Sequence, residues 1–393
     1  MKPAKQWSRR GVLGLGAGAA AGTAFGPVFG AGPAGAAEAA AVPASKRFSL
    51  AGDVYTLLWN DSIYTGTVLQ SFAFDHYRGA IYLAQVLNES GSAGAGRLRI
   101  TKTDLTGKVL GSMTLRDRNG KGWGHGVSIG VESSSVHLRL WVEVDGAVVA
   151  DGDCAGTALA RIPFHDNGTY YPDSPEVEKH VLVSGARNVT CAIDPVNNRL
   201  VQRYKAGSGP FRYRTYALSD VLARKYNVLA EVAQPALSYT GQLRNNKTDN
   251  KWEPLSYTGV FQGYTLHGQY LYLLDGNAYN DCDELTWRDG DMNKPRGSGQ
   301  APSPSPAFVK WCQEQGFPGA PKTSGNAHLT TVDLNTGKTV EQRHITSGES
   351  LTYREAEGMA IQVIAGEARL CYGFAGRDGE ARTTTIMYKD ALV

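Results

Sequence analysis

A strand pattern that recurs five times after residue 50 constrains the fold of this 393-residue chain more than any other feature. Each copy begins with an alternating apolar and polar run, passes a turn rich in Gly, Asn or Asp, and continues into further runs of the same kind. Period-two alternation bounded by such turns is typical of β-strands. The copies begin near residues 70, 124, 188, 261 and 357.

The spacing of the copies predicts the architecture. Units about 55–95 residues apart, with about four strands each, are typical of propeller blades with long loops. Residues 54–59 form one further strand before the first copy, and we expect it to pair with the last blade and close the ring. A two-sheet sandwich is the alternative, but roughly 20 strands are too many for one. The sequence therefore predicts an all-β protein with a single five-bladed β-propeller over residues 46–393.

Two segments depart from the strand pattern. Residues 218–232 have a plausible helical period, with Ser219 and Asp220 as the expected cap, and we interpret them as decoration or a distorted outer strand. Residues 278–326 form a long insertion in blade four. Loops of this length are usually functional or disordered.

The cysteines suggest how that insertion is held. Cys282 and Cys312 flank its Pro, Gly and Ser-rich part, and a disulfide there would close a loop of about 30 residues and stabilise the fold by roughly 3–4 kcal/mol. Cys154 and Cys191 could form a second pair, whereas Cys371 lies in an apolar strand pattern and is expected to be a buried thiol.

The same insertion contains the only hint of a metal site in the sequence. Asp289, Asp291 and Asn293 begin like a calcium-binding loop, but Lys294 and Gln300 replace the expected Gly and Glu. Calcium at these three residues is therefore a weak expectation, with an acidic solvated loop as the alternative. The sequence predicts no other cofactor.

The first 45 residues are predicted to be a secretory signal. Arg9 and Arg10, with Leu13 three residues later, open a Gly/Ala-rich apolar stretch of the twin-arginine type. An Ala/Gly linker preceded by basic residues is the alternative. We therefore expect a secreted protein, extracellular or associated with the cell wall.

Net charge argues against a nucleic-acid partner. The first 45 residues account for the whole formal charge of +3, and the remainder carries 36 basic and 36 acidic residues. Binding to nucleic acid usually needs a basic field, which this balance does not provide. No apolar run long enough to span a membrane follows residue 50, so we expect no transmembrane segment in the mature chain, which we expect to be a monomer.

Candidate site residues come from aligning the five copies on a shared apolar position and stepping back four residues. The positions reached are Gln70, His125, Val189, Gln262 and Glu357. Four of the five are polar, and all would meet at one mouth of the central channel. The residues that follow them are small and are expected to leave room for a ligand or a water chain. A polar, water-filled mouth without a ligand is the alternative.

These side chains allow either binding or catalysis. Amides, imidazoles and carboxylates suit hydroxyl-rich sugars, and the expected substrate-binding residues are Gln70, Gln262, His76, Arg187, Asn188 and Tyr264. His125 and Glu357 could act as acid and base in a uronate lyase or a glycoside hydrolase. A hydrolase would need two carboxylates about 5–10 Å apart.

Four short runs resemble a known β-propeller family. They are Gln70–Asp75, Gly124–Glu132, Leu140–Glu143 and Glu355–Ile361. The runs are similar to those of the teichoic acid biosynthesis protein C family, which is related to the receptor-binding propeller of staphylococcal podophages. The resemblance implies a five-bladed fold, an extracellular location and a cell-wall glycopolymer as ligand, but it supplies no catalytic set.

The sequence therefore favours a secreted propeller that binds a cell-envelope glycopolymer, teichoic-acid-like or another anionic polysaccharide, at one mouth of its channel. The alternative is an enzyme that degrades such a polysaccharide with His125 and Glu357. A smaller alternative is an adaptor that displays the insertion of blade four to a protein partner.

Overall fold

The computed structural model confirms an all-β chain with hardly any helix. It describes residues 41–64, 67–87, 96–148, 154–246, 251–258, 260–276, 327–348, 350–351, 354–378 and 381–393, without the side chains of residues 238–258. Within these ranges the one helix is α1, Leu218–Leu222.

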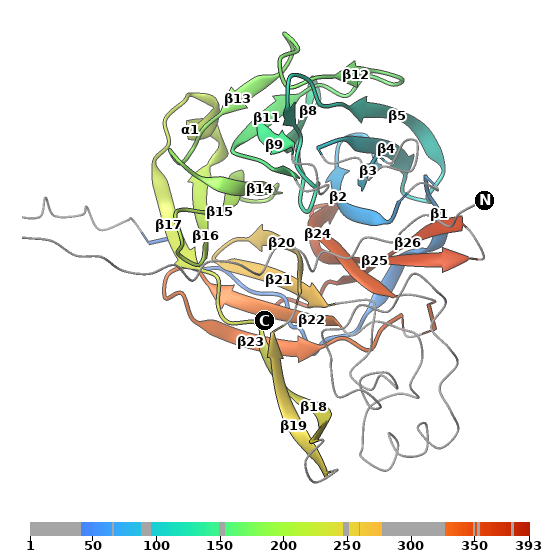
Figure 1. Ribbon diagram of the computed structural model, residues 1–393, viewed down its shortest axis with the longest axis vertical. Helices are drawn as coiled ribbons and strands as arrows, with labels where there is room; N and C mark the ends of the chain where they lie inside the picture. The colour runs from blue at the N-terminus through green and yellow to red at the C-terminus, as the bar shows by residue number, and fades with distance from the viewer. Residues whose placement is uncertain are drawn as a thin grey trace, which may run out of the picture.

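Five antiparallel sheets of four strands form the blades of the ring (Figure 1). Blade one contains, from the channel outward, β2 Leu69–Asp75, β3 Ala80–Val86, β4 Leu98–Asp104 and β5 Val109–Leu115. Blade two contains β7 Gly130–Ser133, β8 Leu138–Val144, β11 Ala158–Ile162 and β13 Glu178–His180. Blade three contains β14 Arg187–Asp194, β15 Arg199–Lys205, β16 Phe211–Ala217 and β17 Val228–Ala233.

The last two blades follow the same plan. Blade four contains β20 Phe261–His267, β21 Tyr270–Gly276, β22 Ala327–Asp333 and β23 Thr339–His344. Blade five contains β24 Glu355–Ile364, β25 Glu367–Asp378, β26 Ala381–Lys389 and, outermost, β1 Tyr55–Ser62. The predicted ring closure is thus confirmed, since Tyr55 pairs with Tyr388 and the ends of the chain complete one blade together.

Smaller strands decorate the ring. Strand β12, Thr169–Tyr170, adds to blade one in parallel with β5. A separate three-stranded sheet contains β6 Lys121–Gly122, β9 Gly146–Val148 and β10 Cys154–Ala155. The hairpin of β18 Ser238–Asn246 and β19 Lys251–Thr258 projects away from the ring (Figure 1).

The core is divided among the interfaces between blades. Five buried apolar clusters occur, and each contains residues from the facing sides of two neighbouring blades. For example, Tyr82 of blade one packs in one cluster with Leu140 of blade two. Each blade is therefore apolar on both faces, and burial of these faces against each other drives the ring to assemble.

The segment over residues 218–232 is part helix and part strand. α1 follows directly on β16, Leu218 and Val221 bury against blade three, and β17 begins six residues after the helix ends. The predicted outer strand is confirmed. The predicted cap at Ser219 and Asp220 is wrong, because the helix begins one residue earlier and its N-cap, Ala217, has no side chain that could cap it.

The cysteine predictions have mixed outcomes. Cys371 is a buried free thiol, as expected. The predicted pair of Cys154 and Cys191 is wrong: Cys191 is also a free thiol, held in the core between blades two and three. Cys282, Cys312, the calcium candidates Asp289, Asp291 and Asn293, and nearly all of the insertion lie outside the described residues.

Described residues that precede position 46 also contact the propeller. The Val42 backbone exchanges two hydrogen bonds with the Asn335 side chain, and the Ser45 hydroxyl accepts one from the Gln269 amide. Residues that we assigned to the signal segment therefore pack against blade four. Residues 1–40, with the twin-arginine motif, lie outside the described part of the chain.

Candidate functional site at the channel mouths

The inner strands begin with an irregularity that recurs around the ring. In blades one, three, four and five, one extra residue interrupts the pairing of the inner strand with its neighbour. The interruptions contain the predicted positions Gln70, Val189, Gln262 and Glu357. Such β-bulges redirect side chains and are common at the rims of rings and beside active sites. We call this end of the channel the bulge mouth.

Close contacts between inner strands bring the predicted positions together. The Ser71 hydroxyl donates to the Gly126 carbonyl at 2.6 Å, and the Thr190 hydroxyl lies 3.2 Å from that of Tyr264. A Cβ on Gly263 would lie 2.8 Å from the Cα of Gly358. Gln70, His125, Gln262 and Glu357 each precede a residue in these contacts, so the ring gathers them at one mouth.

The small residues after those positions do not leave an open space. A Cβ added to Gly358 would lie 2.6 Å from the Cα of Ser71, a distance that real side chains do not reach. Gly358 also has a φ of +79°, which favours glycine. The expectation that these residues make room for a ligand is therefore wrong, because they let the inner strands touch.

The predicted polar side chains differ in their accessibility. Gln70, Gln262 and Glu357 are at most 3% exposed, and the Gln262 amide donates to the Gly276 carbonyl at 3.2 Å. His125 is half-buried, in the segment that precedes β7. Arg187 is exposed at the start of β14, where it donates to the Gly207 carbonyl at 2.7 Å. A ligand at this mouth would thus reach His125 and Arg187 before the buried groups.

Sequence reasoning missed the role of Glu143, which supports His125. One Glu143 carboxylate oxygen accepts from the backbone amides of His125 and Gly126, both at 2.9 Å, and the other accepts from Gly156 at 3.1 Å. A Cβ on Gly124 would lie 2.0 Å from this carboxylate. Glu143 therefore fixes the backbone that carries the imidazole, and the Gly-His-Gly sequence allows that approach.

Arginines gather at the bulge end of the molecule. The strands of blades one, three and five end there with Arg97, Arg99, Arg116, Arg187, Arg203, Arg212, Arg354, Arg377 and Arg382 at or near their termini. The guanidinium of Arg203 lies between the rings of Phe211 and Phe261, at 3.4 and 3.8 Å from their centroids. The sequence gives no local signal for this stacking, because its aromatic partners come from two different blades.

Two predicted binding residues lie elsewhere. Tyr264 is fully buried between blades three and four, and its hydroxyl accepts from the Arg203 amide at 3.0 Å. It is a core residue, out of reach of a ligand. His76 follows the other end of β2, six residues from Gln70, so about 20 Å of strand separates it from the bulge mouth. Asn188, half-buried with a φ of +53°, belongs to the bulge of β14.

The opposite mouth contains a small hollow, which we call the hairpin-side hollow because the inner hairpins turn there. Its lining residues are Ala73, Phe74, His76, Ile129, Gly130, Val131, Ala192, Ile193, Pro195, Thr265, Met359, Ala360 and Ile361. The lining is mostly apolar. Four of the five apolar residues on which we aligned the copies belong to it, namely Phe74, Ile129, Ile193 and Ile361. The alignment itself was therefore sound, and it marks the wall of the channel.

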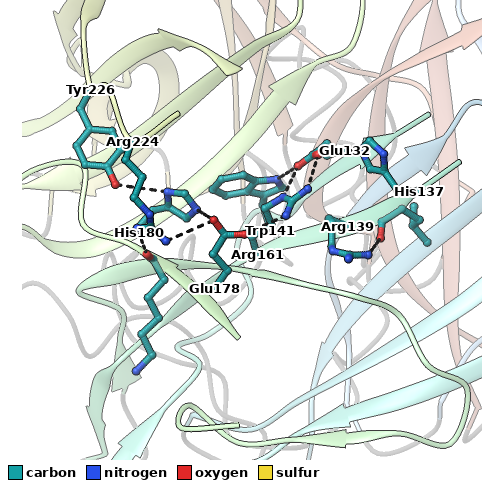
Figure 2. A network of polar contacts seen from close by, with 11 residues as sticks. Glu132, His137, Arg139, Trp141, Arg161, Glu178, His180, Arg224 and Tyr226 are labelled. Carbon is teal, nitrogen blue, oxygen red and sulfur yellow. Dashed lines mark hydrogen bonds and ion pairs between the residues drawn. The ribbon is translucent and has the colours of Figure 1, made fainter. Parts of the chain in front are cut away.

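A polar network in blade two surrounds Glu132, which ends one of the four runs that resemble the propeller family (Figure 2). Its carboxylate accepts two hydrogen bonds from Arg161, at 2.7 and 2.8 Å, and one from the Trp141 indole at 2.9 Å. Burial raises the pKa of Glu132, but the bonds from Arg161, Trp141 and His137 outweigh burial and lower it. Glu132 is thus a structural anion rather than a catalytic acid.

The network continues toward blade three through Glu178 (Figure 2). Arg161 bonds to one Glu178 oxygen at 2.9 Å, while the other lies 3.2 Å from His180 and 3.4 Å from Arg224. His180 is fully buried, 3.5 Å from the Tyr226 hydroxyl. These contacts join β13 to the segment between α1 and β17.

The described residues contain neither a metal-binding cluster nor a membrane-spanning helix. No group of three or more His, Cys, Asp or Glu side chains there could hold a metal ion. No helix among those residues is long and apolar enough to cross a membrane.

Comparisons with known proteins place this ring among receptor-binding propellers. Residues 68–288, more than half of the chain, match the family described as "Phage 5-bladed beta propeller receptor binding platform domain". The chain belongs to this family. The match confirms the five-bladed fold that the repeat spacing predicted.

Two known proteins are similar to this chain in sequence or in structure. The "Putative major teichoic acid biosynthesis protein C" of Bacillus subtilis is 26% identical over 304 residues, which cover 75% of this chain and 52% of that protein. The tail fiber of Staphylococcus aureus phage P68 is 17% identical, with a TM-score of 0.55, over 86% of this chain and 52% of that one. The chain thus spans about half the length of each. These matches confirm the resemblance inferred from the four short runs.

Proposed function

We propose that the chain is a secreted propeller that binds an anionic cell-envelope glycopolymer, teichoic-acid-like or a related polysaccharide, at its bulge mouth. The observation that carries the proposal is membership of a family of receptor-binding platforms. A relative named for teichoic acid biosynthesis supports a polymer of this class.

The chemistry of the bulge mouth supports an anionic ligand. Arginine binds phosphate and carboxylate groups with a planar fork of donors, and it also stacks on aromatic rings. Exposed Arg187 and half-buried His125 are positioned to meet the ligand first, and Arg203 is held rigid between two rings behind them. A rigid guanidinium loses little side-chain entropy when a ligand binds.

The test is retention of the mature protein on purified wall polymers, with one arginine changed at each mouth. Arg187→Gln should weaken binding to phosphate-bearing polymers by up to about 5-fold, the usual effect of one exposed ion pair. Arg78→Gln removes a cation beside Asp75 at the opposite mouth and should leave binding unchanged. An equal loss of polymer binding in both variants would reject the bulge mouth as the site. Binding that is equally strong to charged and uncharged polymers would also reject it.

The same incubation tests the alternative of polymer degradation by His125 and Glu357. A carboxyl group that is 1% exposed within a β-bulge beside the channel is the observation that favours it. An enzyme would shorten the polymer at catalytic protein concentrations, and both His125→Ala and Glu357→Gln would abolish the shortening. A binder would retain the polymer at constant chain length.

A further inference from the structure

The hairpin-side hollow contains one polar side chain that the fold does not satisfy. Thr265 lines the hollow and is fully buried, and its hydroxyl forms no hydrogen bond within the described residues. At the equivalent position, blades one, three and five have Ala73, Ala192 and Ala360, which need no partner. Blade two has Ser128 at this position, and its hydroxyl donates to the Cys191 carbonyl at 2.8 Å. Among the described residues, blade four alone therefore has a hydroxyl without a partner at this position.

A second hydrogen-bond donor, His76, lines the same hollow. The Val363 amide donates to Nδ1 of His76 at 3.0 Å, so the proton of the neutral imidazole lies on Nε2. Burial lowers the pKa of His76, which keeps this ring neutral near pH 7. His76 therefore offers an N–H without a positive charge.

The rest of the lining sets the character of the ligand. None of the lining residues is an Asp, Glu, Lys or Arg, and Phe74, Ile129, Ile193 and Ile361 are apolar. An anion would lose its hydration there without gaining a counter-charge. A neutral group with a short apolar stem and one hydroxyl would pack its stem on these residues and give Thr265 a partner.

An exposed aromatic residue follows the hollow-lining His76 in the sequence. Tyr77 follows His76 on the hairpin turn and is 64% exposed. Aromatic side chains with one apolar face and one wet edge are well suited to pack on the C–H face of a sugar.

We propose that the hairpin-side hollow is a second binding site, which takes the terminal hydroxymethyl group of a neutral sugar or polyol. The methylene lies against the apolar lining, the hydroxyl bonds with Thr265, and Nε2 of His76 donates to a neighbouring oxygen. The site stands at the opposite mouth from the anionic polymer site and does not depend on it.

A matched pair of glycosides tests the proposal. Methyl β-D-glucopyranoside and methyl β-D-xylopyranoside differ only in the hydroxymethyl group, and ligand-observed NMR titration gives the apparent Kd of each. Wild-type protein should bind the glucoside about 10–50-fold more tightly, as expected for one hydrogen bond together with a buried methylene. Glycerol provides the polyol arm, and its competition with the glucoside would assign the group to a linear chain as well.

Substitutions distinguish the effect of the Thr265 hydroxyl on binding from an effect on the fold. Thr265→Val keeps the shape but removes the hydroxyl, so it should reduce the preference for the glucoside to the roughly 4-fold expected for the buried methylene alone. Thr265→Ser should keep the full preference. Thr331→Val is the matched control, since Thr331 is a fully buried threonine of the same blade whose hydroxyl also has no partner among the described residues, but which does not line the hollow.

The outcomes are distinct from those for the polymer site. Arg187→Gln should leave glucoside binding unchanged, and Thr265→Val should leave polymer retention unchanged. Equal affinity of the wild-type protein for both glycosides, no binding of either, or a preference that Thr265→Val does not reduce would overturn the proposal.

Discussion

Carboxylates of the two innermost strands of the blades serve different purposes, and the hydrogen-bond partners of each carboxylate determine its role. Glu143 holds the backbone at His125, Glu132 holds Arg161 and Trp141, and Glu357 lies buried in a bulge. The sequence placed Glu357 at the channel mouth and gave no role to Glu132 or Glu143. The distinction depends on partners that come from neighbouring strands or neighbouring blades.

Removal of the Glu132 charge should cost stability without touching the channel mouths. In Glu132→Gln the Arg161 guanidinium, whose side chain is 18% exposed, loses its bidentate partner. Breaking a mostly buried pair in this way costs about 3 kcal/mol of unfolding free energy. Urea denaturation measures the loss. Asp173→Asn, which breaks an exposed pair with Arg118, should cost under about 0.5 kcal/mol and serves as the control.

Acidification should destabilise the protein through His180. Burial lowers the pKa of this imidazole, while Glu178 opposes the shift and Arg224 and Arg161 reinforce it. Below the unfolded-state pKa of about 6.5, the unfolded chain binds the proton more readily than the folded one, so stability falls as pH falls. His180→Phe keeps a ring beside Trp141 but removes the proton site.

The check is the unfolding free energy at pH 7 and pH 5. The wild-type protein should lose more stability between these values than His180→Phe does, by up to about 1.4 kcal/mol per pH unit below 6.5 for this one group. His76 and His267, whose pKa values burial also lowers, add to the slope in both proteins and cancel from the comparison. Identical slopes would show that His180 does not titrate in the expected direction.

At the scale of strands, period-two alternation predicted the five blades and the closing strand, because local patterning determines which faces are buried. The alternation also allowed the five copies to be aligned on one apolar position. The residues four positions before it lie within the bulges of blades one, three, four and five. The alternation did not predict that the following small residues lie in contact. That contact joins strands nearly 100 or more residues apart, such as Gly358 with Gly263 and with Ser71, and leaves no local signal in the sequence.

Gly358 should therefore be much less tolerant of a side chain than other glycines of its blade. Gly358→Ala places a Cβ 2.6 Å from the Cα of Ser71 at a φ of +79°, whereas Gly366→Ala has a similar φ of +85° but nothing within 4 Å. Gly366→Ala should cost about 1–2 kcal/mol for conformation alone. Gly358→Ala should cost about 2–3 kcal/mol more, because the strands must separate. Equal losses in thermal or urea unfolding would contradict the close contact.

At the scale of the whole molecule, the ring presents two mouths with opposite chemistry. The bulge end of the molecule is rich in arginine, with some of these residues paired to carboxylates such as Asp117 and Glu231. The hairpin-side hollow is mostly apolar and contains no ionised side chain among its lining residues. The sequence-based site combined residues from both ends, because Gln70 lies near the start of β2 and His76 directly follows its end. Only the register and direction of the strands separate them.

The two mouths give the proposed receptor-binding role a physical form. An anionic backbone would be held by fixed guanidinium groups at one end, while a neutral hydroxymethyl group would fit the other. The family match covers blades one to three and the inner part of blade four, so the bulge ends of blades one and three, with their arginines, lie within it.

The most direct test is to incubate the mature protein with purified phosphate-bearing and uronate-bearing wall polymers and follow both retention and chain length over time. The account predicts that the protein is retained on an anionic polymer of unchanged length, and that retention weakens in Arg187→Gln. Shortening of the polymer at catalytic protein concentrations, or retention only on neutral glycans, would contradict it.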